Sequence, residues 1–160
     1  MVTLRPIDES NRSALEALRI SPTQERFVST VADSLLEAAE EPDGRAIAWG
    51  VYDDETPIGF VMISDEVGAP GYIPQYLWKL IVDERFQRRG NGTATLDLIV
   101  AYFSGRPGVE EMWTSAGQGE GSPIPFYERY GFVRTGEVVF DDEVLLRLDL
   151  AAGPGRSRDL

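Results

Sequence analysis

The chain has 160 residues, 42% of them hydrophobic, which suits one domain with a core of its own. It contains neither cysteine nor histidine, which excludes disulfides, thiolate nucleophiles, imidazole bases and the common zinc ligands, so we expect no metal site. A net charge of −12 disfavours nucleic acid as a partner and would attract cationic substrates such as amines, although acidic residues also serve solubility.

The N-terminal residues predict a strand followed by a short helix. Residues 2–6 have the pattern of a strand. Asp8 or Ser10 can cap the helix that follows, in which Leu15 and Leu18 lie one turn apart.

A longer helix is predicted next. Phe27, Val31 and Leu35 recur at intervals of four residues, which is the spacing of one helix face. We therefore expect a helix over residues 23–39, ended by the Pro-Asp-Gly sequence at 42–44.

Three strands follow in the middle of the chain. Residues 46–52 and 57–64 are separated by the polar turn 53–56, which makes them antiparallel neighbours. After a Gly- and Pro-rich loop at 67–74, residues 76–82 form the next strand.

The loop Gln87-Arg88-Arg89-Gly90-Asn91-Gly92 lies between this strand and a helix predicted over residues 93–103. The first backbone N–H groups of a helix have no partner within it, and glycine lets the backbone approach a ligand closely. With two arginines in the loop, and Arg85 just before it, this position predicts a site for a pyrophosphate.

The C-terminal half predicts the rest of a sheet. In chain order we expect a strand at 109–115, a flexible glycine-rich bridge at 117–121, a helix capped by Ser122 and running from Pro123 to Tyr130, a C-terminal cap at Gly131, strands at 132–140 and 143–150, and a disordered tail at 151–160.

Other glycine-rich loops fit the residues less well. A dinucleotide-binding fingerprint needs a third glycine, which the sequence from Gly90 to Thr95 lacks. A Walker loop needs a lysine that is not present. The alternative that the glycines only make a tight turn stays open.

Two sequence motifs occur in this order along the chain. Gln87, Gly90 and Gly92 fill the form Q/R-x-x-G-x-G/A after an apolar strand, and residues 126–132 read Phe-Tyr, three residues, then Gly-Phe. Together these motifs resemble the GCN5-related N-acetyltransferase (GNAT) family. The resemblance covers residues 3–150, and it implies a GNAT domain at 1–150. The implied fold is mixed α/β, with a mostly antiparallel, splayed sheet of six to seven strands and about four helices.

Residues 24–28 and 34–38 further resemble the bacterial spermine/spermidine acetyltransferase branch of this family, although ordinary amphipathic helices have similar sequences. The family resemblance implies acetyl-CoA as cosubstrate. It assigns contacts with the coenzyme to Leu80, Ile81, Val82, Gln87, Arg88, Arg89, Gly90, Asn91, Gly92, Thr93, Ser115, Ser122 and Tyr127. Leu80 to Val82 would supply backbone donors to the oxyanion, and Tyr127 would protonate the leaving thiolate.

The general base is not identified by sequence. The strand 76–82 contains no carboxylate. Asp65 and Glu66 could line the substrate side, and Glu25 is a further candidate, but each also reads as a solvated surface acid. Ser122 could contact the coenzyme or only cap its helix.

The function expected is transfer of an acetyl group from acetyl-CoA to a primary amine of a small, polyamine-like molecule. We expect direct transfer in a ternary complex, because no acyl-enzyme nucleophile is evident. The alternatives are a protein or peptide N-acetyltransferase and a non-catalytic acyl-CoA sensor. With no signal peptide and no membrane-spanning apolar run, a cytoplasmic protein is expected, and a homodimer is possible.

Overall fold

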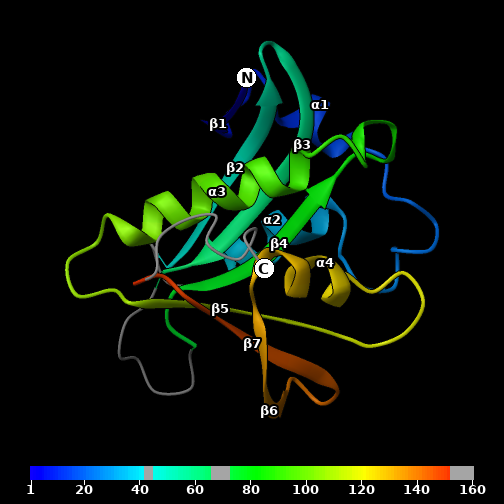
Figure 1. Ribbon diagram of the computed structural model, residues 1–160. Helices are drawn as coiled ribbons and strands as arrows, with labels where there is room; N and C mark the ends of the chain where they lie inside the picture. The colour runs from blue at the N-terminus through cyan, green and yellow to red at the C-terminus, as the bar shows by residue number, and fades with distance from the viewer. Residues whose placement is uncertain (42–44, 66–72, 152–160) are drawn as a thin grey trace.

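The computed structural model describes residues 1–41, 45–65 and 73–151. Within these ranges the chain forms a mixed α/β fold around a seven-stranded sheet of order β1-β2-β3-β4-β5-β7-β6 (Figure 1). All neighbouring strands in this sheet are antiparallel except β4 and β5, which are parallel. The fold class predicted from the sequence is thereby confirmed.

The observed elements follow the predicted order closely. They are β1 (Val2–Pro6), α1 (Arg12–Glu16), α2 (Val31–Ala39), β2 (Ala46–Asp53), β3 (Thr56–Ser64), β4 (Tyr76–Val82), the 3-10 helix η1 (Glu84–Phe86), α3 (Asn91–Ser104), β5 (Glu111–Ala116), α4 (Ile124–Tyr130), β6 (Val133–Val139) and β7 (Glu143–Asp149). The residues at 42–44, most of the loop at 67–74, and the tail beyond Ala151 lie outside the described residues.

The helix predicted over residues 23–39 is wrong in its first half. Residues 22–27 form turns, and α2 begins only at Val31. Thr30 is extended, and its side chain accepts a hydrogen bond from the Asp33 amide at 3.1 Å, which caps the helix. The spacing of Phe27 from Val31 therefore matches a helix face without belonging to one.

Helices cover both faces of the sheet, and each face has its own core. α3 packs on the face toward the viewer in Figure 1, while α1 and α2 lie behind the sheet. The core under α3 includes Leu96 and Phe103, and the core under α1 and α2 includes Leu15 and Phe60. We call these two sides the α3 face and the α1/α2 face.

β4 carries a β-bulge at Trp78. Met62 of β3 pairs with Lys79, but the next residue, Ile63, pairs with Leu77, so Trp78 is the extra residue. Leu77, which precedes the bulge in the sequence, belongs to the α3 core, whereas Ile81, which follows it, belongs to the α1/α2 core.

β4 and β5 pair over a very short stretch and then diverge. Their register consists of Tyr76 with Trp113 and Leu77 with Thr114, although β4 continues to Val82 and β5 to Ala116. We call these two residue pairs the apex of the splay, because the sheet opens beyond them.

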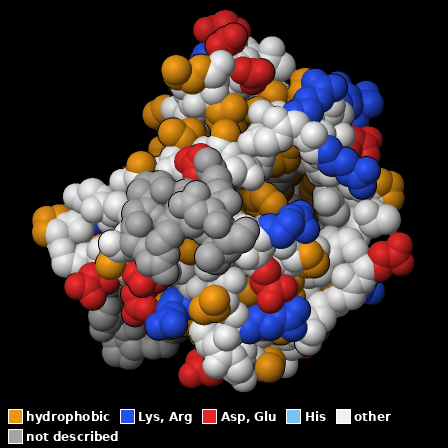
Figure 2. Space-filling model, in the orientation of Figure 1, with side chains coloured by type: hydrophobic (Ala, Val, Ile, Leu, Met, Phe, Trp, Pro, Cys, Tyr) orange, Lys and Arg blue, Asp and Glu red, His pale blue; other side chains and the backbone are white. Residues whose placement is uncertain are grey.

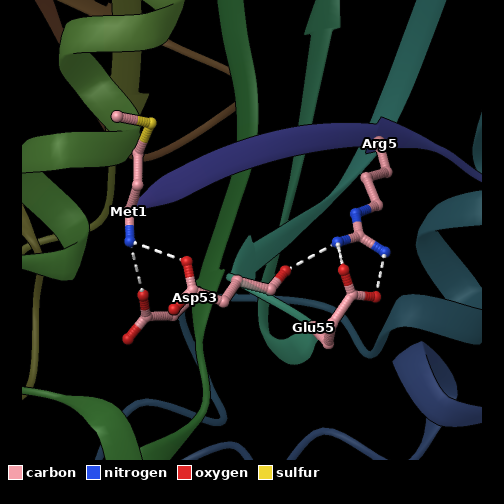
Figure 3. Close-up of polar contacts among 5 residues, drawn as sticks. Met1, Arg5, Asp53 and Glu55 are labelled. Atoms are coloured by element: carbon pink, nitrogen blue, oxygen red, sulfur yellow. Dashed lines mark hydrogen bonds and ion pairs between the residues drawn. The ribbon is translucent and has the colours of Figure 1, made fainter.

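The turn between β2 and β3 is held to the edge strand β1 by charged groups (Figure 3). The Met1 ammonium lies 3.1 Å from carboxylate oxygens of Asp53 and Asp54, and Arg5 pairs with Glu55. These groups are largely exposed, so water and salt screen the attraction and its effect on stability is small. In the described part of the chain no helix is both long and apolar enough to cross a membrane.

Candidate active site

A cleft of about 650 Å³ opens where β4 and β5 diverge. Figure 2 shows a hollow on this face of the molecule, with hydrophobic side chains inside it and basic side chains along its rim. The lining comes from three parts of the chain: the segment Ile20, Thr23, Gln24, Phe27 and Val28; the segment Leu80, Ile81, Val82, Gln87, Arg88, Gly90, Gly92 and Thr93; and the segment Glu120, Gly121, Ser122, Pro123, Pro125, Phe126, Tyr127 and Arg129.

The N-terminus of α3 forms one end of the cleft. Gly90 is its N-cap, with φ of 82°, and Gly90 accepts the first helical hydrogen bond from the Ala94 amide at 2.9 Å. The amides of residues 91–93 precede that bond and point out of the helix end, where an anion can accept from them. A Cβ on Gly92 would lie 3.0 Å from the Phe126 ring, so glycine keeps this approach open.

The side chains of Gln87 and Asn91 hold the loop in shape. Gln87 Nε2 donates to the Val82 carbonyl at 2.8 Å and to Gln24 Oε1 at 2.9 Å. Asn91 Nδ2 donates to the Phe86 carbonyl at 2.9 Å. Gln87 therefore ties the loop both to the end of β4 and to the N-terminal segment.

The three arginines near the loop have different positions. Arg88, in a left-handed conformation with φ of 62°, lines the cleft, whereas Arg89 lies outside the lining with its guanidinium carbon 5.8 Å from the Phe86 ring centre. Arg85 pairs with Asp83 at 2.9 Å. The three arginines therefore do not form one cluster in the cleft, because Arg85 forms an ion pair with Asp83 instead.

Asp83 joins β4 to the segment after α1. Its side chain is 0% exposed and accepts hydrogen bonds from the Arg19 amide at 2.8 Å and from Arg85. The hydrogen bonds from Arg85, together with the amides, lower the pKa of Asp83 to about 2 against the opposing effect of burial.

Tyr127 lies on α4 at the α3 face of the apex and is 5% exposed. Burial raises the pKa of its hydroxyl, which lies beside the Thr114 side chain, to about 12. Thr114 Oγ1 in turn donates to the Leu77 carbonyl at 2.9 Å. The Tyr127 hydroxyl is therefore protonated across the neutral range and fixed beside the cleft.

Ser122 was predicted to be the N-cap of α4, but the N-cap is Pro123, and Ser122 contacts the start of the helix from one residue earlier. Its hydroxyl donates to the Gly117 carbonyl at 2.5 Å and accepts from the Ile124 amide at 3.2 Å, at the start of α4. It also lines the cleft, so a contact with a ligand is compatible with its position.

Among the described residues, Asp65, Glu25 and Ser115 do not line the cleft, and neither do Arg89 and Asn91 of the loop. Asp65 accepts from the Tyr102 hydroxyl at 2.9 Å and pairs with Arg106, which engages it away from the lining. Glu25 is exposed and does not line the cleft, and Glu66 lies outside the described residues. Ser115 contacts Tyr76 and Glu143 instead. The carboxylate found in the lining is the exposed Glu120.

Sequence reasoning missed the wall made by residues 20–28. This segment meets the glycine-rich bridge at 117–121, where a Cβ on Gly121 would overlap the Thr23 carbonyl oxygen and one on Gly119 would overlap the Arg26 guanidinium. The repeated glycines were the available signal, because they mark close backbone approach as well as flexibility.

Comparison with known proteins gives the family and its curated relatives. Residues 12–132 match the model of the Acetyltransferase (GNAT) family. The chain is similar to the spermine/spermidine N(1)-acetyltransferase of Bacillus subtilis strain 168, with 23% identity over 93% of this chain and 99% of that protein. Both resemblances seen in the sequence are confirmed.

Solved structures share the fold. An acetyltransferase from Thermus thermophilus matches with a TM-score of 0.71 and 19% identity, covering 93% of this chain and 97% of that one. The ribosomal-protein-S18-alanine N-acetyltransferase of Escherichia coli matches with a TM-score of 0.64 and 16% identity, covering 94% of each chain. At these identities the likeness concerns the fold, which serves acceptors of more than one kind.

Proposed function

Because the chain belongs to the acetyltransferase (GNAT) family, we propose that it transfers the acetyl group of acetyl-CoA directly to a primary amine of a small, polyamine-like molecule. The observation that carries this proposal is the cleft at the splay of β4 and β5. In one continuous space it joins the N-terminus of α3, the strand Leu80 to Val82, and the buried residue Tyr127.

The cleft residues suit an extended, phosphorylated thioester. The amides of residues 91–93 and the Arg88 guanidinium would hold its diphosphate. Among the described strands, the part of β4 after Leu77 is paired with β3 alone. The backbone groups on its β5 side therefore face the cleft. Those groups would align the pantetheine arm and donate to the carbonyl oxygen as negative charge develops on it.

Acetyl transfer places two demands on protons. An alkylammonium with a pKa near 10.4 is neutral in only about one molecule in 2,500 at pH 7, so the acceptor must lose a proton before it attacks. When the carbon–sulfur bond then breaks, the thiolate needs a donor, and the protonated Tyr127 hydroxyl lies in the cleft to provide one. The sequence has no cysteine, which favours direct transfer over a thioester-linked enzyme.

Two observations support a polyamine-like acceptor. The relative from Bacillus subtilis is named for spermine and spermidine and aligns over almost its whole length. The net charge of −12 creates a field that attracts cationic molecules. A cytoplasmic location and a homodimer stay predictions.

The test is release of free coenzyme A from acetyl-CoA in the presence of separate panels of polyamines, aminoglycosides, amino acids and peptides. We expect turnover with polyamines to exceed turnover with peptides. Preference for a peptide N-terminus or lysine would replace the proposal by a peptide acetyltransferase. Binding of acetyl-CoA without turnover on any acceptor would identify a sensor.

Tyr127→Phe tests the proton donor. We expect kcat to fall about 100-fold, the low end of the usual range for a general acid, with the Kd of acetyl-CoA unchanged. The matched control is Tyr130→Phe on the same helix, which removes a hydroxyl that donates to Asp97. Isothermal titration and steady-state rates measure both quantities, and an unchanged kcat in Tyr127→Phe would remove this residue from the reaction.

A further inference from the structure

Three side chains form a directed hydrogen-bond chain on the α1/α2 face of the apex. The Tyr76 hydroxyl lies 2.5 Å from Ser115 Oγ, and Ser115 Oγ donates to Glu143 Oε1 at 2.8 Å. A serine hydroxyl has one proton, and here Glu143 receives it. Tyr76 must therefore donate to Ser115, and the chain runs from Tyr76 through Ser115 to the Glu143 carboxylate.

This hydrogen-bond chain and the hydroxyl of Tyr127 lie on opposite faces of the sheet. Thr114 and Ser115 are consecutive residues of β5, so their side chains point to opposite faces of the sheet. Thr114 contacts Tyr127 on the α3 face, whereas Ser115 contacts Tyr76 on the other. The first contact lies at the apex and the second one residue beyond it, so an acyl group held there would have a hydroxyl on each side.

The two ends of the chain differ in exposure. Tyr76 is buried, and the Phe140 ring lies 6.1 Å from its ring, centre to centre. Glu143 is only partly buried, and so it can exchange protons with water. Tyr76 does not line the cleft itself, but it lies at the apex, close enough to Tyr127 for the two phenols to interact electrostatically. The three side chains therefore lead from the apex to solvent through hydrogen-bonded oxygen atoms.

We propose that Tyr76, Ser115 and Glu143 are the relay that removes a proton from the acceptor ammonium on the α1/α2 face. This inference rests on the proposed acetyl transfer and supplies the base that the sequence did not reveal. Tyr76 is the member that meets the amine, and Ser115 and Glu143 act through it.

The relay balances the reaction. The ammonium gives one proton to the Tyr76 oxygen as Tyr76 passes its own proton to Ser115 and Ser115 passes its own to Glu143, which later releases it to water. The neutral nitrogen forms a bond with the thioester carbon, and the carbon–sulfur bond breaks with its electron pair on sulfur. The second nitrogen-bound proton replaces the one that Tyr127 gives to the thiolate. One proton is released per turnover.

The surroundings of Tyr76 favour its protonated form, so that it passes protons on and does not act as a phenolate base. Burial raises the pKa of Tyr76, and the negative charge of Glu143 adds to the effect, so the phenol keeps its proton until it receives another. β6 places the uncharged Val139 opposite Glu143. The other charged groups close to Glu143 in sequence are Asp141 and Asp142 in the turn before β7, and Arg147 on β7, which pairs with Glu111 of β5.

Glu143→Gln keeps the shape of the relay and removes its proton acceptor. In this variant transfer depends on the acceptor molecules that are already neutral. We expect kcat/KM at pH 7 to fall about 1,000-fold and then to rise tenfold per pH unit, approaching the wild-type value near the pKa of the amine, about 10. Glu137→Gln, an exposed carboxylate on β6, is the matched control and should follow the wild-type profile.

Ser115→Ala separates proton relay from simple attraction. It leaves the Glu143 charge in place but breaks the path to it, so we expect the same steep pH profile as in Glu143→Gln. If Glu143 only attracted the ammonium, Ser115→Ala would keep the wild-type profile and Glu143→Gln would raise KM alone, which would overturn the proposal.

An acceptor that is neutral at the assay pH bypasses the relay. With a polyamine analogue fluorinated next to its accepting nitrogen, wild type and Glu143→Gln should differ less than threefold. A loss of rate in Glu143→Gln that is equal at every pH and for both acceptors would show a structural role and contradict the relay. If the wild-type protein transfers no acetyl group to any amine, the proposed function fails first.

Discussion

The two walls of the cleft are built in different ways. The wall from Gln87 to Thr93 is one continuous segment, and its conformation follows from its own residues: a left-handed Gly90, a helix end, and a glutamine bonded back to β4. The opposite wall joins residues 20–28 to residues 117–123, which are about a hundred positions apart. The first wall can be recognised in a sequence, whereas the second exists only after the chain has folded.

Glycine has a different task in each wall. At Gly90 a Cβ would meet nothing within 4 Å, so the positive φ alone favours glycine there. At Gly121 the φ is 84° and a Cβ would also overlap the Thr23 carbonyl oxygen. The second wall therefore depends on the absence of a side chain more strictly than the first.

Gly121→Ala should have the largest effect, because it pushes two backbone segments apart. We expect a loss of about 3 kcal/mol in the free energy of unfolding and a loss of acetyl-CoA binding. Gly136→Ala is the control: its φ is 88°, but nothing lies within 4 Å of the added carbon, so about 1 kcal/mol is expected from backbone strain alone. Urea denaturation measures both, and equal losses would mean that the two walls do not differ in this respect.

Asp83→Asn tests the contact between the end of β4 and Arg19, which precedes the wall segment 20–28. We expect a loss of about 2 kcal/mol at pH 7, because the hydrogen bonds from Arg19 and Arg85 to the buried Asp83 lose their charged acceptor. The pKa of Asp83 is about 2 in the folded protein and near 3.9 in an unfolded chain, so this stabilisation is present above pH 4 and is lost as pH falls from 4 toward 2.

The measurement for Asp83 is urea denaturation between pH 2 and pH 7. The variant should show a shallower loss of stability with acid than the wild type does. Asp53→Asn, at an exposed site, serves as the control and should follow the wild-type curve. An unchanged pH dependence in Asp83→Asn would show that Asp83 does not fasten the wall.

Arg88→Ala and Arg89→Ala sharpen the comparison within the first wall, with the smallest effects. Arg88 lines the cleft and Arg89 does not, so we expect the Kd of acetyl-CoA to rise about tenfold in Arg88→Ala and less than threefold in Arg89→Ala. Calorimetry at two salt concentrations measures this, and the Arg88 effect should shrink as salt screens the charge. Equal effects would place both guanidinium groups on the ligand.

The parts of the molecule that sequence predicts are those governed by near neighbours. The seven strands and the glycine loop were predicted because alternation, turn residues and helix ends are local properties. The helix over 23–39 was placed wrongly because Phe27 satisfies helical spacing but packs in the wall of the cleft instead.

Residues that act through distant partners were not predictable. Asp65 looked available as a base until folding placed Arg106 and Tyr102 against it. Glu143 was never a candidate, because nothing in its local sequence shows that the Ser115 hydroxyl donates to it across 28 positions of chain.

The extra residue at position 78 divides β4 into two stretches with opposite parity. Tyr76 and Ile81 share one side of the sheet although their numbers differ by five, whereas Leu77 and Leu80, three apart, share the other. Deleting Trp78 would restore plain alternation along β4. The side chains of Tyr76 and Leu77 would then exchange faces relative to those of Leu80 and Ile81. For the same reason, aligning a relative to this strand without allowing for that residue would assign its acceptor-side groups to the wrong surface.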